Sequence, residues 1–391
     1  MVDRIVYLGL YNNYKKEELF KKAINYLIEG RGDRFYYILP NGILLEDYRQ
    51  RMIEEVGGAF DINLFTFDDI VDRLLEDRFY TLVDSNAKEI ILYQIVNRLM
   101  EEGKLNYYRS ISSKKGFISS LIYIIGQIKR SLISVEDYFE SCPKEPFFTE
   151  IGLIYEEYER QLSFHNLIDR EGSFFKALSL LREDNSFFNG LDYIIIDGFF
   201  DFRPQELELL KEISKTNCPI FINMPFNRKN NFNTLIETLG LLEKLGYRVE
   251  KEERGGLSYY EELANHIFSG GTKKLDPNSN TYLIKAANTH LELKKIAELI
   301  KRHKLEGISL KDMAIVLVDS ADYKDRLFQV FKEEEIPTSL NKEIKLIELP
   351  LIRELLHILQ LKENTKESII NRIKSSYFNL INIEDREAIE R

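Results

Sequence analysis

The stretch LDYIIIDGFFDFRPQELELL, residues 191–210, indicates the fold more clearly than any other part of the chain. Its three isoleucines at 194–196 are typical of a strand that is buried on both faces, and they end at an acid, Asp197. A helix follows, with Pro204 in its first turn. A buried strand that carries a carboxylate at its end is how ATPases place an acid near Mg²⁺. A glutamate usually follows to polarise the attacking water, but here Gly198 follows.

Strands and helices alternate on both sides of this stretch. Before it, we predict strands at 4–9, 35–40 and 62–67, each followed by a helix, at about 15–29, at 45–56 and after 67, where Asp68 is expected to cap the third. After it come a strand CPIFINMP, a helix NTLIETLGLLEKLG that stops at Gly246, and YRVEKEE as an edge strand. Such alternation predicts an α/β protein with a parallel sheet and crossover helices.

A long helical segment interrupts the alternation. Between 86 and 189 apolar residues recur at three- and four-residue spacings and no strand is evident, which predicts an inserted helical subdomain. The first α/β domain is then formed by 1–85 plus 190–270. The polar stretch SGGTKKLDPNSN (269–280) reads as a linker. Beyond it, TYLIKAA and DMAIVLV predict strands of a second α/β unit at 281–345, and 346–391 reads as helical.

Composition narrows the possible functions. A chain of 391 residues suits two or three domains, and its net charge of −10 weakens a nucleic-acid function without excluding one. Cys142 and Cys218 are far apart, and none of the five histidines forms a pair with metal-ligand spacing. The N-terminus has too short an apolar run for a signal peptide, and no run approaches the length of a membrane span. We therefore expect a cytoplasmic protein.

The first strand–loop–helix has the spacing of a phosphate loop without its chemistry. In G-x-x-x-x-G-K-[ST] the second glycine lets backbone amides approach phosphate, the lysine reaches the β/γ oxygens and the hydroxyl binds Mg²⁺. Here Gly9 and Lys15 stand in place, but Tyr14 replaces the second glycine and Lys16 replaces the hydroxyl. Taken alone, this segment is more often a coincidental glycine and lysine in a strand–helix turn.

Asp197 and Gly198 depart from the same expected site. For an isolated acid after an apolar strand, capping of the next turn or an ion pair is the commoner role, and Gly198 supplies no general base. Together with Tyr14 and Lys16, this makes two independent departures from one ATP site. We interpret the pair as a nucleotide site that has lost hydrolysis.

Two sets of residues are candidates for contact with nucleic acid. Asn41 follows one predicted strand, and Thr66 and Phe67 lie at the end of another. All three are of types that hold a single strand, although ordinary loop and core roles are favoured locally. Residues 285–311 hold seven basic residues against three glutamates, which is a local positive patch or, more commonly, a solvated helix face. The basic residues of that segment are Lys285, Lys294, Lys295, Lys301, Arg302, Lys304 and Lys311.

The order of elements resembles the N-terminal part of the AddB/RexB family, which supplies one of the subunits of bacterial ATP-dependent helicase–nucleases that process double-strand DNA ends. YILPNGILLEDYRQRM and INLFTFDDIVDRLL are similar to family segments, and YIIIDGFFDFRPQELELL is the most specific match. HLELKKIAELIKRHKLEGISLKDMAIVLVDSADYKDRLFQVFKEEEIPTSLN resembles the start of the second motor domain. The wider relatives are the UvrD-type superfamily 1 helicases. The similarity spans essentially the whole chain.

The resemblance implies a RecA-like, P-loop-type sheet domain with a degenerate motor, an inserted helical subdomain and the beginning of a second RecA-like domain. It implies DNA, single-stranded or at a duplex end, and an AddA-like motor subunit as partners in double-strand break repair. The family's PD-(D/E)xK exonuclease domain and its iron–sulfur cysteines map to no residue of 1–391. Mg²⁺ and an iron–sulfur cluster are therefore expected only in a longer protein, and we expect this segment to be an N-terminal fragment without a cofactor.

The resulting hypothesis is a DNA-binding subunit without ATPase activity. DNA is expected across the ends of the strands, near 40–42, 66–67 and 199–203, with Phe199 and Arg203 added to the candidate contacts. One alternative is a helicase-fold scaffold that binds no DNA, which the acidic balance favours. The other is an active helicase with an atypical loop, against which Tyr14, Lys16 and Gly198 all argue.

Overall fold

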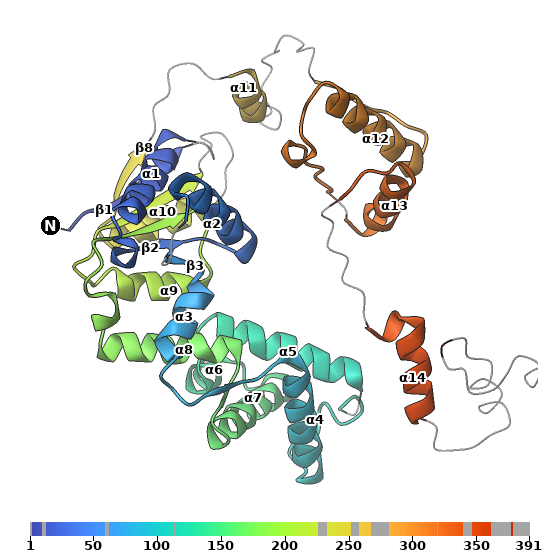
Figure 1. Ribbon diagram of the computed structural model, residues 1–391. Helices are drawn as coiled ribbons and strands as arrows, with labels where there is room; N and C mark the ends of the chain where they lie inside the picture. The colour runs from blue at the N-terminus through green and yellow to red at the C-terminus, as the bar shows by residue number, and fades with distance from the viewer. Residues whose placement is uncertain are drawn as a thin grey trace, which may run out of the picture. The chain divides into compact units, whose positions relative to one another are not determined.

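The computed structural model describes residues 2–9, 13–58, 62–112, 114–225, 233–251, 258–266, 281–318, 320–338, 346–360 and 377 (Figure 1). The chain divides into two compact units, Met1–Leu275 and Asp276–Arg391. The boundary between them falls within the predicted linker, whose own residues lie outside the described ones.

A six-stranded sheet forms the centre of the first unit. All its strand pairs are parallel, and the strand order is β3-β2-β6-β7-β1-β8. This confirms the α/β prediction, including the edge position of the last strand. The strands are β1 (Arg4–Gly9), β2 (Phe35–Ile38), β3 (Leu64–Phe65), β6 (Tyr193–Asp197), β7 (Ile220–Pro225) and β8 (Arg248–Lys251).

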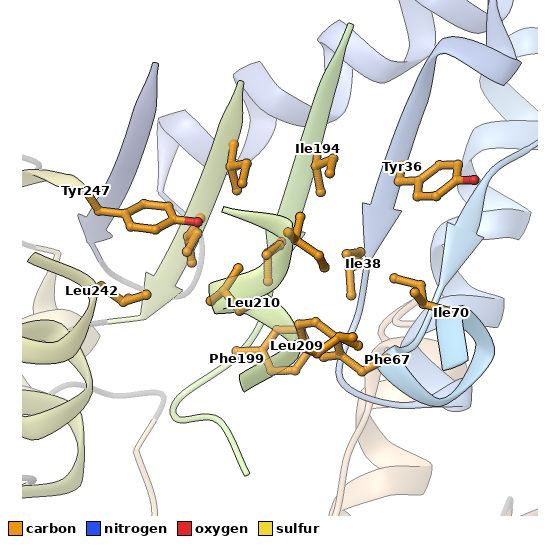
Figure 2. Packing of buried hydrophobic residues seen from close by; sticks show 14 of the residues in the cluster. Tyr36, Ile38, Phe67, Ile70, Ile194, Phe199, Leu209, Leu210, Leu242 and Tyr247 are labelled. Atoms are coloured by element: carbon orange, nitrogen blue, oxygen red, sulfur yellow. The ribbon is translucent and has the colours of Figure 1, made fainter. Parts of the chain in front are cut away.

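Helices cover both faces of the sheet, as right-handed crossovers between parallel strands require. One face packs against α1 (Tyr14–Ile28) and α2 (Gly42–Val56). The other packs against α3 (Phe67–Leu75), α8 (Arg170–Glu183), α9 (Pro204–Ile213) and α10 (Asn233–Lys244), and Figure 2 shows this core. A further helix, α11 (Tyr259–His266), follows β8 along the chain.

Alternation along β6 decides where its acid lies. Ile194 packs with Leu209 and Leu210 of α9 on one face (Figure 2), and Ile196 belongs to the same core. Tyr193 and Ile195 belong to the opposite core, beneath α1 and α2. Because side chains alternate with a period of two, Asp197 continues the second set and faces α1 and α2.

The three helices that follow β1, β2 and β3 of the six-stranded sheet begin at side-chain caps. Asn13 caps α1 and Asn41 caps α2, each accepting a backbone N–H three residues on. Thr66 caps α3 and forms a reciprocal capping box with Asp69. The prediction that Asp68 caps this helix was therefore wrong, and the strand before it is shorter than expected because Thr66 already belongs to the cap.

The helical insertion has a hydrophobic core of its own. One short parallel pair, which the sequence did not indicate, joins its two ends: β4 (Thr81–Leu82) with β5 (Leu167–Ile168). Helix α8 lies in the predicted subdomain by sequence, yet Phe174, Ala177 and Leu178 are part of the core beneath the sheet. The helices of the insertion before α8 are α4 (Ser85–Glu101), α5 (Lys115–Arg130), α6 (Val135–Ser141) and α7 (Pro146–Phe164).

The second unit contains helices, two of which share a small core, and no strand among its described residues. Strands were predicted at 281–287 and 312–318, and this prediction was wrong. A strand needs a hydrogen-bonded neighbour, and the described residues supply none, so Leu283, Val316 and Val318 remain exposed. The helices are α12 (Thr289–Leu305), α13 (Ser320–Glu333) and α14 (Pro350–Gln360), and most of the helical segment predicted at 346–391 lies outside the described residues.

No single helix among the described residues combines the length and the apolar composition that a membrane span needs. Only α5 and α6 taken together meet those two criteria, and they are bent by 95° at their junction.

Candidate functional site

Asp197 lies at the carboxyl end of β6 with both carboxylate oxygens engaged. Its Oδ2 accepts hydrogen bonds from the hydroxyls of Tyr37 (2.8 Å) and Tyr48 (2.7 Å). Its Oδ1 accepts a hydrogen bond from Nδ2 of Asn223 at 2.7 Å. The residue is 0% exposed. A buried carboxylate is stable only when donors of this kind replace water, so these three contacts account for its burial.

The donors converge because they occupy matching positions on neighbouring elements. Asn223 on β7 is the direct register partner of Asp197, and Tyr37 on β2 is the partner of Ile195, one pleat earlier on the same face. Tyr48 reaches down from α2 and its ring lies 5.4 Å from that of Tyr37. Burial, reinforced by the nearby Asp197 charge, holds the pKa of Tyr37 well above its usual value, so its hydroxyl remains a donor.

Asn13 extends this network to the start of α1. Its Nδ2 donates to Oδ1 of Asn223 at 2.9 Å, and its Oδ1 accepts the backbone N–H of Lys16 at 2.8 Å. Amides at the first turn of a helix after a strand are the groups that bind phosphate in nucleotide sites. In this protein the amide of Lys16 is already bonded to the side chain of Asn13.

The residues of the expected phosphate loop are placed as follows. Gly9 ends β1, and residues 10–12 lie outside the described ones. Lys15 Nζ lies 2.9 Å from Oε2 of Glu18, a hydrogen bond that raises the pKa of Lys15. Tyr14 is exposed, whereas Lys16 is buried with its Nζ 5.7 Å from the centre of the Tyr48 ring. The lysine that would reach phosphate is thus paired with an acid on its own helix.

Gly198 has a backbone conformation that explains why no glutamate stands there. Its φ is +84°, in the left-handed region that residues with a Cβ rarely adopt. A Cβ at this position would lie 3.0 Å from Cδ2 of Leu44 and 3.5 Å from Cδ of Pro40. The residue after Asp197 therefore supplies no general base, and it occupies a turn with a left-handed backbone conformation.

The hydrogen bonds around Asp197 limit the ligands that its carboxylate can bind. The three donors occupy three of the roughly four acceptor sites of the Asp197 carboxylate, and the side chain is 0% exposed. Among the described residues no group of three or more histidine, cysteine, aspartate or glutamate side chains is arranged to hold a metal ion. We call Asp197, Tyr37, Tyr48, Asn223 and Asn13 the polar network, because its contacts join three strands and two helices.

The predicted DNA contacts are mostly engaged within the protein. Asn41 caps α2 and Thr66 caps α3. Phe67 and Phe199 are buried, with ring centres 5.4 Å apart, and so cannot stack on a base. Arg203 donates to Oδ2 of Asp68 at 2.8 Å and to Glu206. These five residues do lie together at the carboxyl ends of β2, β3 and β6.

Three exposed side chains lie at the same edge: Tyr14, which was predicted only as part of the phosphate loop, Phe200, which falls within the predicted DNA segment 199–203 but was not singled out, and Ile43, which was missed. Tyr14 begins α1 after β1, Ile43 is the second residue of α2 after β2, and Phe200 follows β6. They are 54%, 85% and 63% exposed, respectively. Phe200 directly follows the predicted contact Phe199, and Ile43 lies two residues after the predicted contact Asn41. The sequence does not show which of these neighbouring side chains is exposed, whereas the structure does.

The basic residues of α12 lie in the second unit, where acids compensate most of them. Lys295 Nζ is 2.6 Å from Glu298, Lys301 Nζ is 2.7 Å from Glu334, and Arg302 also reaches Glu298 at 3.4 Å. Lys294 is exposed. The pairing favours the interpretation of this segment as a solvated helix face.

Comparison with known proteins identifies the family to which this chain belongs. Residues 8–240 match the family model described as ADDB, N-terminal, which is more than half of the chain. The chain belongs to the AddB family. Residues 257–390 match a second model, the UvrD-like helicase C-terminal domain. This confirms the resemblance seen in the sequence and agrees with a RecA-like, superfamily 1 helicase-type fold.

Curated AddB relatives cover nearly all of the chain at low identity. The B-type subunit of the ATP-dependent helicase/deoxyribonuclease of Carboxydothermus hydrogenoformans is 25% identical over 94% of this chain and 34% of its own length. The protein of the same name from Listeria monocytogenes is 24% identical over 86% of this chain and 31% of its own. For the exonuclease/helicase subunit RexB of Lactococcus lactis the values are 24%, 96% and 36%. The chain thus spans about a third of the length of these relatives.

Proposed function

We propose that this chain is the DNA-contacting part of an AddB-type subunit of an ATP-dependent helicase–nuclease, and that its own RecA-like site does not hydrolyse ATP. The observation that carries the proposal is the complete burial of Asp197, whose carboxylate accepts hydrogen bonds from Tyr37, Tyr48 and Asn223. A carboxylate that binds Mg²⁺ keeps lone pairs available. The subunit role rests on the names of the relatives, which are subunits of helicase/deoxyribonuclease or exonuclease/helicase complexes.

The DNA-contacting surface in this proposal is the carboxyl edge of the sheet. Ligands of open α/β sheets bind outside the carboxyl ends of the strands. Tyr14 and Phe200 supply exposed rings there, and Ile43 supplies an exposed apolar side chain. Rings stack on bases irrespective of sequence, so a single strand is the form of DNA that this edge suits. An AddA-like motor subunit remains the partner that we propose.

Replacing Phe200 with alanine is expected to weaken binding of a single-stranded oligonucleotide about five- to a hundredfold, the range measured for loss of one base–ring stack. Fluorescence anisotropy with a labelled oligonucleotide at several salt concentrations measures it. Wild-type affinity should also fall as salt rises, because phosphate contacts release counterions. Phe164→Ala, which removes a 79% exposed ring from α7, is the matched control and should leave affinity unchanged.

Two outcomes would decide against this surface. If Phe164→Ala weakens binding as much as Phe200→Ala, the contact is not located at the sheet edge. If the wild type binds no oligonucleotide at low salt, the protein-binding scaffold becomes the better description.

Restoring the glutamate by Gly198→Glu should not create an ATPase. The left-handed φ and the 3.0 Å approach to Leu44 are expected to lower the free energy of unfolding by about 2 kcal/mol. Phosphate release from ATP, with and without single-stranded DNA, should stay at background for the wild type and the variant. Gly198→Ala tests the backbone strain and the Cβ contact with Leu44 without the added carboxylate. DNA-stimulated turnover by the wild type, lost in Asp197→Asn, would instead support the active helicase with an atypical loop.

A further inference from the structure

A pocket of about 520 Å³ runs beside α1 on the face of the sheet. Tyr7 of β1 and Phe221 of β7 line it from the sheet, and Lys22 and Tyr26, one turn apart, line it from the helix. The Tyr7 and Phe221 rings lie within 15° of parallel, with centres 6.4 Å apart. None of these residues takes part in the polar network around Asp197. The volume is within the range of small-molecule sites.

Lys22 is the unusual group in this pocket. Its Nζ lies 4.2 Å from the centre of the Tyr193 ring and 4.5 Å from that of Phe221, so the ammonium sits against two aromatic faces. Its side chain has no hydrogen bond or ion pair with any residue that the structure describes, and partial burial lowers its pKa. A half-buried cation without a counter-ion is costly, and an anion in the pocket would relieve that cost.

The neighbouring cations Lys15 and Arg31 differ from Lys22 because each forms an ion pair. Lys15 is paired with Glu18, at one end of the pocket. Arg31, at the other end, is paired with Glu29 and Asp192. Lys22 therefore lacks the direct ion pair that these two cations have, and the carboxylates of Asp3, Glu18 and Asp192 act on it from beyond ion-pair distance.

The hydroxyl of Tyr193 is a second, independent sign of a missing ligand group. Tyr193 is 1% exposed, and its hydroxyl has no hydrogen-bond partner among the described residues. Its ring is one of the two faces against which Lys22 lies. Tyr26, which lines the pocket, has its ring centre 4.8 Å from that of Tyr193.

We propose that this pocket binds a phosphate-bearing nucleotide, with the phosphate at Lys22 and the base against Tyr7 and Phe221. Lys21, exposed at the rim, adds a second positive charge. The rings and the lysines together match the two halves of a nucleotide better than they match a simple inorganic anion. A free mononucleotide and the 5′-terminal nucleotide of a strand share this chemistry. The site lies apart from the degenerate phosphate loop and does not require DNA at the carboxyl edge.

The test is calorimetric titration of the full chain with dAMP, with inorganic phosphate and with deoxyadenosine. We expect dAMP to bind at least tenfold more tightly than either half, and Lys22→Met to weaken dAMP at least tenfold. Phe221→Leu, which removes the ring but keeps an apolar side chain, should weaken dAMP and leave phosphate unaffected. Lys115→Met removes a lysine whose side chain is 82% exposed on α5, and it should change nothing.

A second arm identifies the source of the nucleotide. In a Phe200→Ala background, which weakens the proposed strand contact, a short oligonucleotide with a 5′-phosphate is compared with its 5′-hydroxyl counterpart. Preference for the phosphorylated strand assigns the pocket to a strand terminus, and binding of dAMP alone assigns it to a free nucleotide. Failure of dAMP to bind, or equal binding to Lys22→Met with an unchanged melting temperature, overturns the proposal. Lys22→Gln repeats the test if the methionine variant is unstable.

Discussion

Replacing Asp197 with alanine is expected to lower the free energy of unfolding of the first unit by about 3 to 5 kcal/mol. The change leaves three buried donors, on Tyr37, Tyr48 and Asn223, without an acceptor, and each unsatisfied group costs about 1 to 3 kcal/mol. Urea denaturation followed by circular dichroism measures the loss. An open metal ligand behaves differently, because its removal leaves no buried donor stranded.

Matched variants make this prediction specific. Tyr48→Phe removes one donor while Asp197 keeps two, so it should cost only about 1 to 2 kcal/mol. Asp201→Ala removes an exposed acid four positions along the chain and should leave stability essentially unchanged. A loss below about 1 kcal/mol for Asp197→Ala would mean that the donors find other partners and that the polar network does not hold the strands together.

Replacing Lys129 with methionine is expected to destabilise the helical insertion by a similar amount, about 3 to 5 kcal/mol. Lys129 is 1% exposed, and its Nζ lies 2.5 Å from Glu159 and 2.6 Å from Asp169. Removing the cation leaves the buried Asp169 and the partly buried Glu159 without their common partner. Hydrogen exchange of amides in α5, α7 and α8 should then accelerate by about a hundredfold or more.

The destabilisation caused by Lys129→Met should depend on pH. Burial already raises the pKa of Glu159 in the wild type, and Lys129 opposes that rise. Without Lys129 the folded-state pKa of Glu159 should rise further above its unfolded value. A raised folded pKa favours the protonated, folded form, so the destabilisation should shrink as pH falls from 7.5 toward 5. Lys115→Met is the control, and equal destabilisation at both pH values would contradict the ion-pair explanation.

The sequence predicted the first unit well because its signals are local. The buried isoleucines of β6, the position of Pro204 and the glycine after α10 are each fixed by neighbours in the chain, and the parallel sheet follows from the alternation. The role of Asp197 was not predictable in the same way. Its donors come from positions 160, 149 and 26 residues away in the chain, and no spacing rule connects an acid to Tyr37, Tyr48 and Asn223.

The solvent exposure of individual side chains was also not predictable from the sequence. Phe199 and Phe200 are identical in type and adjacent, yet one is buried against Phe67 and the other is exposed. The left-handed turn at Gly198 decides which ring points outward. In the second unit the apolar runs resembled strands, but whether such a run becomes a strand depends on a neighbouring strand rather than on its own residues.

Helix α8 has a consequence for how force passes through the molecule. Its first turn is tied to the helical insertion, because Glu171 pairs with Lys88 and Arg130. Its flank is packed beneath the sheet, and Arg203 lies over the ring of its Phe174. A helix of about four turns bends little, so α8 forms a rigid connection between the helical insertion and the sheet. Displacing one part relative to the other is therefore expected to strain both the ion pairs of Glu171 and the packing of Phe174.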